Sequence, residues 1–242
     1  MRDRAIVITS ISPTHHNVFA QAIAMRSWVN SGFEVVSMNA REEAEALAPY
    51  YPGVKFITTQ RTGAGSFKAP YVSISAMIDH ARESGKDYCI LANSDIVLAS
   101  PEQLEENMAA ASLGMLIANR HDHNGDFQNP TIYRYGFDVF VIHRELLSDI
   151  PQSLFVMGQT WWDYWLPWRF IKLGHTVTIM TTPAFMHHRH PVQYDQKEWE
   201  RMTEHFVWME RYPMRGQPMT GRLAQRITND VYKHIMRHSN AR

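Results

Sequence analysis

Short apolar runs alternate with helical segments along the first part of the chain. The runs are rich in Ile and Val and lie at residues 5–9, 33–38, 54–58 and 88–92. Helical spacing of apolar residues occupies the segments between them, at residues 18–31, 42–48 and 72–84. This alternation is typical of successive βα units, whose strands are buried on both faces of a parallel sheet. The sequence therefore predicts an α/β fold with a mostly parallel sheet flanked by helices.

The pattern is less regular after residue 92 and favours a mixed sheet. We expect helices at residues 101–112 and 161–172 and strands at residues 114–119, 137–143 and 177–182, the last of which ends the sheet. A polar loop is expected at residues 120–130. From Trp199 on the pattern is helical, and after residue 210 it is also basic. The predicted organisation is a domain over residues 1–198 and a basic C-terminal helical extension over residues 199–242.

The charge balance and cysteine content bound the function. Lys plus Arg and Asp plus Glu number 24 each, so no overall positive field favours nucleic acid as a partner. The single cysteine, Cys89, lies in an apolar run and is expected to be buried in a reducing, cytoplasmic setting. No run approaches the ~20 apolar residues that cross a bilayer. Residues 5–9 are expected to form a strand and no signal segment.

The segment ILANSDIVLAS places polar side chains directly after an apolar strand. Asn93, Ser94 and Asp95 would lie at the carboxyl edge of the sheet, where open α/β sheets bind their ligands. A carboxylate held there can bind a divalent cation against a diphosphate. The alternative is a simple turn stabilised by Asx hydrogen bonds.

The segment GQTWWDYWLPW surrounds one acid, Asp163, with aromatic residues. Trp161, Trp162 and Tyr164 offer faces that pack on sugar rings, and their bulk would raise the pKa of Asp163 toward that of a general base. The alternative is an acid at a helix start with tryptophans in the core.

Two further segments carry candidate ligands. His187 and His190 follow the last predicted strand and could add nitrogen ligands to a metal at Asp95, although surface histidines are often inert. A glycine-containing loop ahead of a helix carries Arg61 and Lys68, which could meet phosphate charge. This loop lacks the spacing of a Walker motif.

In this order, the segments resemble glycosyltransferases of the GT-A fold. The resemblance covers roughly residues 5–195 and is strongest to GT-A-like proteins with a WWDxWL element and a His-rich loop. It implies a nucleotide-sugar donor near Thr9, Ser10 and Asn39. It further implies Mn²⁺ or Mg²⁺ at Asp95 with His187 or His190, and an acceptor near Trp161, Trp162, Asp163, Tyr164 and Asp138. The sequence departs from the usual Asp-x-Asp motif at Asn93, which leaves a single carboxylate for a metal.

The resulting hypothesis is transfer of a sugar to a hydroxyl of a glycan or other acceptor, with Asp163 as general base. A carbohydrate- or nucleotide-binding module without catalysis is the first alternative, and a nucleotidyltransferase is the second. The basic C-terminal helices could also hold the protein peripherally on the inner face of a membrane, or could pack as a helical cap.

Overall fold

The computed structural model describes residues 1–14, 18–111, 114–125, 128–189, 195–214 and 216–241. The helices are α1 (Val18–Asn30), α2 (Arg41–Leu47), α3 (Ile74–Glu83), α4 (Pro101–Ala111), α5 (Trp162–Lys172), α6 (Gln196–Glu210) and α7 (Gly221–His238), with short 3-10 helices at Arg2–Arg4, Ala48–Tyr50 and Arg144–Asp149. Every one of these helices is too short or too polar to span a membrane.

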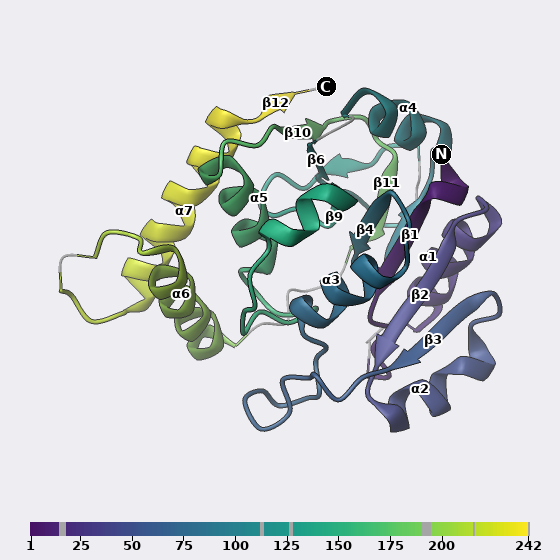
Figure 1. Cartoon of the computed structure of the whole chain (residues 1–242), viewed down its shortest axis with the longest axis horizontal. Coiled ribbons are helices and arrows are strands. Elements are labelled where there is room, and N and C mark those ends of the chain that lie inside the picture. The colour runs from purple at the N-terminus through teal and green to yellow at the C-terminus, as the bar shows by residue number, and fades with distance from the viewer. Residues whose placement is uncertain (15–17, 112–113, 126–127, 190–194, 215, 242) are drawn as a thin grey trace.

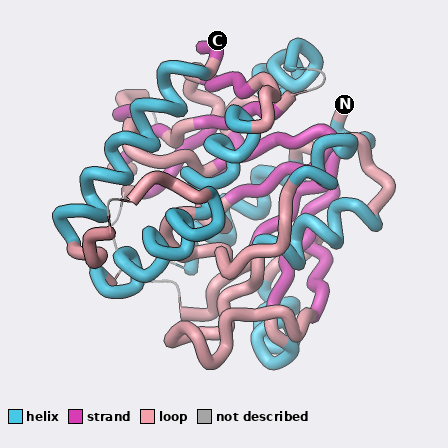
Figure 2. The backbone as a smooth tube through the Cα atoms, turned by 60° about the vertical axis from the view of Figure 1, so that its left-hand side comes forward, coloured by secondary structure: helices cyan, strands magenta, loops and turns pink. Residues whose placement is uncertain are grey.

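The main sheet runs through the centre of the molecule (Figures 1 and 2). Its strands are β1 (Ala5–Thr9), β2 (Glu34–Asn39), β3 (Val54–Thr58), β4 (Tyr88–Ala92), β6 (Met115–Ala118), β9 (Val139–His143), β10 (Val177–Met180) and β12 (Asn240–Ala241). Their spatial order is β12-β10-β6-β9-β4-β1-β2-β3. Only β9 is antiparallel to its neighbours in the described sheet. The predicted mixed, mostly parallel α/β fold is confirmed.

Alternate residues of the central strands face two separate apolar cores. Ile6 and Ile8 of β1 belong to a core that includes residues of α3, α5, α6 and α7. Ala5 and Val7 face the other side, where α1 and α4 pack with α2. Side chains that are buried on both faces explain the continuous apolar runs of the sequence.

A second, smaller sheet lies beside the main one and was not predicted. It contains β5 (Ile96–Leu98), β7 (His121–His123), β8 (Thr131–Ile132) and β11 (Phe185–His188), in the order β5-β11-β7-β8. The prediction of a loop throughout residues 120–130 is therefore wrong, and so is the prediction that His187 lies in a loop. Strands of two to four residues are too short to show a clear alternation of apolar and polar positions.

The C-terminal helices are integrated into the fold. The Asp195 side chain caps α6 and the Thr220 side chain caps α7, through hydrogen bonds from backbone N–H groups. Phe206 of α6 and Val231 of α7 are fully buried in the core that also contains β1. The expectation that the sheet ends at residue 182 is wrong, because β12 adds a parallel strand beside β10. The basic segment therefore forms one wall of the main body of the protein.

Candidate functional site

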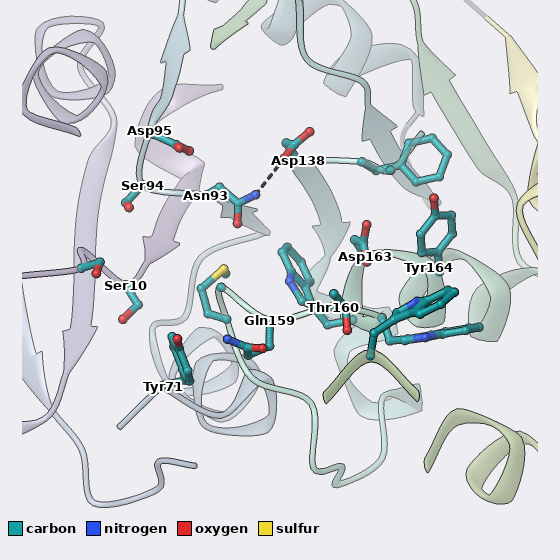
Figure 3. Close-up of a pocket in the computed structure, with 18 of the residues that line it drawn as sticks. Ser10, Tyr71, Asn93, Ser94, Asp95, Asp138, Gln159, Thr160, Asp163 and Tyr164 are labelled. Atoms are coloured by element: carbon teal, nitrogen blue, oxygen red, sulfur yellow. Dashed lines mark hydrogen bonds between the residues drawn. The ribbon is translucent and has the colours of Figure 1, made fainter. Parts of the chain in front are cut away.

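A cavity of about 690 Å³ opens at the edge of the main sheet where the strand order reverses. Strands β2 and β3 follow on one side of β1, whereas β4 lies on its other side. Ser10 follows β1, Asn93 and Asp95 follow β4, and all three line the cavity (Figure 3). Ligands of open α/β sheets bind in the crevice at such a switch point.

A chain of polar contacts crosses the floor of this cavity. Asn93 Nδ2 donates to Oδ1 of Asp138 at 2.8 Å, the contact dashed in Figure 3. Arg120 donates to the same Asp138 oxygen at 3.0 Å and to Oδ1 of Asp122 at 2.8 Å. Asn93, Arg120 and Asp138 lie at the ends of three neighbouring strands, β4, β6 and β9, whereas Asp122 lies in β7 of the second sheet. The network joins the strand ends through hydrogen bonds that involve charged groups, and such bonds are stronger than those between neutral groups.

His187 lies between two carboxylates and is only 2% exposed. Its Nδ1 lies 2.8 Å from Asp122 Oδ1, and its Nε2 lies 3.3 Å from Asp95 Oδ2. Burial alone would lower the pKa of His187, but the hydrogen bonds to Asp122 and Asp95 outweigh burial and raise the pKa to about 9. Asp122 thus fixes the orientation of the imidazole ring relative to Asp95.

The Asp95–His187 pair could bind a divalent cation if the metal displaces the Nε2 proton of His187, because a histidine binds a metal only in its neutral form. Metal-binding histidines characteristically donate their second ring N–H to a carboxylate, and Asp122 occupies that position here. Within the described residues no group of three His, Cys, Asp or Glu side chains is arranged to hold a metal ion. A cation at this place would therefore need further ligands from a bound molecule or from water in addition to Asp95 and His187.

Asp163 lines the same cavity from the start of α5, on the side of the network where Asp138 lies. Burial and the negative charge of Asp138 raise the pKa of Asp163 to about 7. Backbone hydrogen bonds from Phe137 and Tyr164 lower it and so limit the shift. A carboxylate of this pKa changes protonation near neutral pH and is suited to accept a proton from a bound hydroxyl.

The residue before α5 adopts an unusual backbone conformation. Trp161 has a φ of 81°, in the left-handed region that side chains other than glycine rarely adopt. Its Nε1 donates to Thr203 Oγ1 at 2.7 Å, and its ring stacks on Phe206 with centroids 4.6 Å apart. These contacts with α6 hold a conformation that costs about 1–3 kcal/mol. The first turn of α5, and with it Asp163, is therefore fixed by α6.

A second buried contact joins the loops after β1 and β4. Gln21 of α1 is fully buried, and its Oε1 accepts hydrogen bonds from Ser94 Oγ at 2.6 Å and from the backbone N–H of Ser12 at 3.0 Å. Its amide nitrogen donates to the Ser12 carbonyl at 2.9 Å. This glutamine holds together the two segments that form the switch-point crevice.

The residues predicted from sequence divide between the cavity and its surroundings. Those that line it are Ser10, Lys68, Asn93, Ser94, Asp95, Asp138, Trp161, Trp162, Asp163, Tyr164 and His187. Thr9 and Asn39 are fully buried behind it, and Asn39 holds the Ile11 carbonyl at 2.8 Å. Arg61 lies outside it and pairs with Asp79. His190 lies outside the described residues.

Sequence reasoning did not select Gln21, Arg120 and Asp122 as site residues. For Arg120 a signal was present, since it closely follows an apolar strand, as Asn93 and Asp95 do. Asp122 gave none, because it lies within the short strand β7 and its partner His187 is 65 residues away. Gln21 gave no signal, because its partners are 9 and 73 residues away in the chain.

Comparisons with known proteins identify the fold. No profile of a known family and no curated protein matches the sequence. Residues 1–349 of S. aureus TarS, crystallised with UDP-GlcNAc, are similar with a TM-score of 0.50 and 9% identity, over 97% of this chain and 73% of that chain. Glucosyl-3-phosphoglycerate synthase from Mycobacterium tuberculosis, crystallised with Mg²⁺ and uridine diphosphate, is similar with a TM-score of 0.54 and 11% identity, over 88% of this chain and 80% of that chain. The chain has the fold of these GT-A glycosyltransferases, as the sequence predicted.

Proposed function

We propose that the protein is a glycosyltransferase that transfers a sugar from a nucleotide-sugar donor to a hydroxyl group. The observation that carries the proposal is that one cavity contains both a pair suited to hold a cation and a carboxylate suited to accept a proton. The Asp95–His187 pair, backed by Asp122, lies at the switch point, and Asp163 with its pKa of about 7 faces the same space. In the similar structures the same fold binds UDP-GlcNAc or UDP.

The donor would lie in the crevice formed by the ends of β1 and β4. Ser10 and Ser94 line the part of the cavity where the nucleotide would bind, and the Gln21 contacts keep this part open in a fixed shape. Asp95 and His187 would hold Mn²⁺ or Mg²⁺, which would neutralise the charge of the departing diphosphate. Lys68 also lines the cavity and lies 3.3 Å from Asp195, and it would add positive charge near the phosphates on leaving that carboxylate.

The acceptor hydroxyl would approach from the side of α5. Asp163 would take its proton as the new glycosidic bond forms, if the reaction inverts the anomeric centre. Near neutral pH a pKa of about 7 leaves a large fraction of Asp163 ionised and able to accept this proton. Tyr164 forms part of the adjoining wall and would position the acceptor. Trp161 and Trp162 are 1% and 2% exposed, so the expectation that their faces pack on a sugar ring is wrong, and they would support this wall from the core and exclude water.

Calorimetric titration with UDP, GDP, CMP and dTDP, each with and without Mn²⁺, tests the donor class and the metal site. UDP comes first, because the similar structures contain it or a UDP-sugar. We expect one nucleotide to bind, more tightly with Mn²⁺, and Asp95→Ala to abolish the metal effect. If no nucleotide binds under either condition, the proposal is wrong. Binding of a nucleotide-sugar with no transfer to any acceptor would favour a binding module without catalysis.

A further inference from the structure

One wall of the cavity comes from a helix that the proposed mechanism does not use. α7 contributes four residues to the lining, Gln225, Thr228, Asn229 and Tyr232. Their spacing of three, one and three residues places them on one face of the helix. The opposite side of α7 is anchored, because Leu223, Ile227, Val231 and Ile235 are buried in the core. The lining face is therefore held rigidly against the cavity.

Aromatic rings gather where α7 meets the rest of the wall. The ring of Tyr232 lies 5.9 Å from Tyr135, 6.3 Å from Phe137 and 6.3 Å from Tyr164, measured between centroids. Tyr135 is 66% exposed although it packs against Tyr232. Tyr164 directly follows Asp163 in α5, so this aromatic group adjoins the carboxylate that would accept the proton.

The α7 wall contains amides and hydroxyls but no charged group. Arg222, Arg226, Asp230 and Lys233 are exposed and do not line the cavity. Arg120 and Lys68 do line it, but Arg120 faces Asp122 and Asp138, and Lys68 lies 3.3 Å from Asp195. The charge of Arg134 acts on Tyr232, but Arg134 is exposed and does not line the cavity. An anionic ligand on this wall would approach Asp138 and Asp163 without a cation from α7 to compensate. The wall is suited to an uncharged ligand with many hydroxyls.

We infer that α7 and the adjoining tyrosines form a binding site for a neutral carbohydrate, which serves as the acceptor. Tyr135 and Tyr232 would pack on the apolar face of a sugar ring, and Gln225 and Asn229 would exchange hydrogen bonds with its hydroxyls. This inference deepens the proposed function, since it names the acceptor class. The donor crevice contributes none of these residues, so the two sites can be tested separately.

Saturation-transfer NMR with the protein over residues 1–242 tests the inference. The probes are the neutral disaccharides cellobiose, maltose, lactose and mannobiose, with digalacturonate as the anionic counterpart. We expect at least one neutral disaccharide to bind and digalacturonate to bind at least tenfold more weakly. Binding of digalacturonate alone, or of no neutral disaccharide, overturns the inference.

Substitutions on α7 locate the site. Asn229→Ala and Gln225→Ala remove exposed amides without touching the core, and each is expected to weaken disaccharide binding about tenfold. Arg226→Ala and Lys233→Ala, on the same helix but outside the cavity, are expected to bind as the wild type does. Equal binding by all four variants and the wild type overturns the assignment to α7. Nucleotide titration of the same variants separates the two proposals. If a disaccharide binds but no nucleotide does, the glycosyltransferase proposal is wrong and the carbohydrate site on α7 still stands.

Discussion

Gly136 passes so close to Asp163 that a Cβ atom at residue 136 would lie 3.1 Å from Asp163 Oδ2. The glycine also has a φ of 100°, which other residues rarely adopt. Glycine is therefore required at residue 136 for two reasons. It can adopt this backbone conformation, and it leaves room for the carboxylate of Asp163, the proposed general base.

Gly136→Ala should lower turnover at least tenfold, because the added methyl group displaces the Asp163 carboxylate. Part of the effect will be backbone strain, which costs about 1–2 kcal/mol of stability. Gly125→Ala is the matched control, since Gly125 has a φ of 96° but open space where its Cβ would lie. Similar losses of turnover in the two variants would show that the approach to Asp163 has no importance.

Asp163→Asn should reduce turnover about 100-fold or more and leave the affinity for the donor nearly unchanged. Loss of a general base affects the chemical step, whereas the proposed nucleotide site is formed by the ends of β1 and β4 and does not include Asp163. Steady-state kinetics combined with nucleotide calorimetry measures both quantities. Normal turnover in this variant would remove Asp163 from the mechanism.

The pH profile gives an independent check of the same residue. Because the carboxylate must be ionised to accept a proton, kcat/KM of the wild type should rise with pH and level off above about 7. In Asp163→Asn the residual activity should lose this step. A wild-type profile that is flat between pH 5 and 8 would contradict the assignment.

Asp163 should also make the fold less stable as the pH rises. Its pKa is raised in the folded state from 3.8 to about 7, so the folded protein holds this proton more tightly than the unfolded chain does. The stabilisation is complete below pH 4 and is lost as the pH rises through 7. Asp163→Asn is therefore expected to exceed the wild type in unfolding free energy by roughly 1–3 kcal/mol at pH 8, with no such gain at pH 4. Urea titrations at the two pH values measure this difference.

Much of this architecture follows from the sequence, but its polar contacts do not. The strands β1, β4, β6 and β10 of the main sheet are buried on both faces, so their apolar runs reveal them, and the rule of polar residues after strands led to Asn93 and Asp95. Asp122 was missed because its importance depends on His187, 65 residues further along the chain. The α7 wall was missed because its amides appear in the sequence as an ordinary solvent face, and only the packing of Val231 and its neighbours turns them toward the cavity.

Asp122→Asn should weaken Mn²⁺-dependent nucleotide binding 10- to 100-fold, the usual effect of losing a carboxylate behind a histidine ligand. The variant keeps the size of the side chain but cannot hold the charge that orients His187. Asp149→Asn is the matched control, since Asp149 lies 2.8 Å from Nε2 of His175 outside the cavity. Calorimetry with UDP and Mn²⁺ compares the two variants. Equal affinities in both would show that the Asp122 contact does not support metal binding.

The basic residues of α7 lead to the last prediction, which concerns a membrane surface. Four exposed basic residues form one stripe along the helix, Arg222, Arg226, Lys233 and Arg237. Their spacings of four, seven and four residues are each close to a whole number of helical turns. Such a stripe is attracted to anionic lipids by about 1 kcal/mol for each cation near the surface, and salt weakens the attraction.

Flotation with vesicles that contain phosphatidylserine should recover the wild type at low salt. Reversing the charges of Arg226 and Lys233 to Glu should abolish recovery, whereas reversing the exposed Arg26 and Lys55 on α1 and β3 should not. These surface changes are preferable to deleting residues 211–242, because the deletion would remove core residues such as Val231. Equal recovery of both double variants would show that the basic stripe of α7 does not bind the membrane surface.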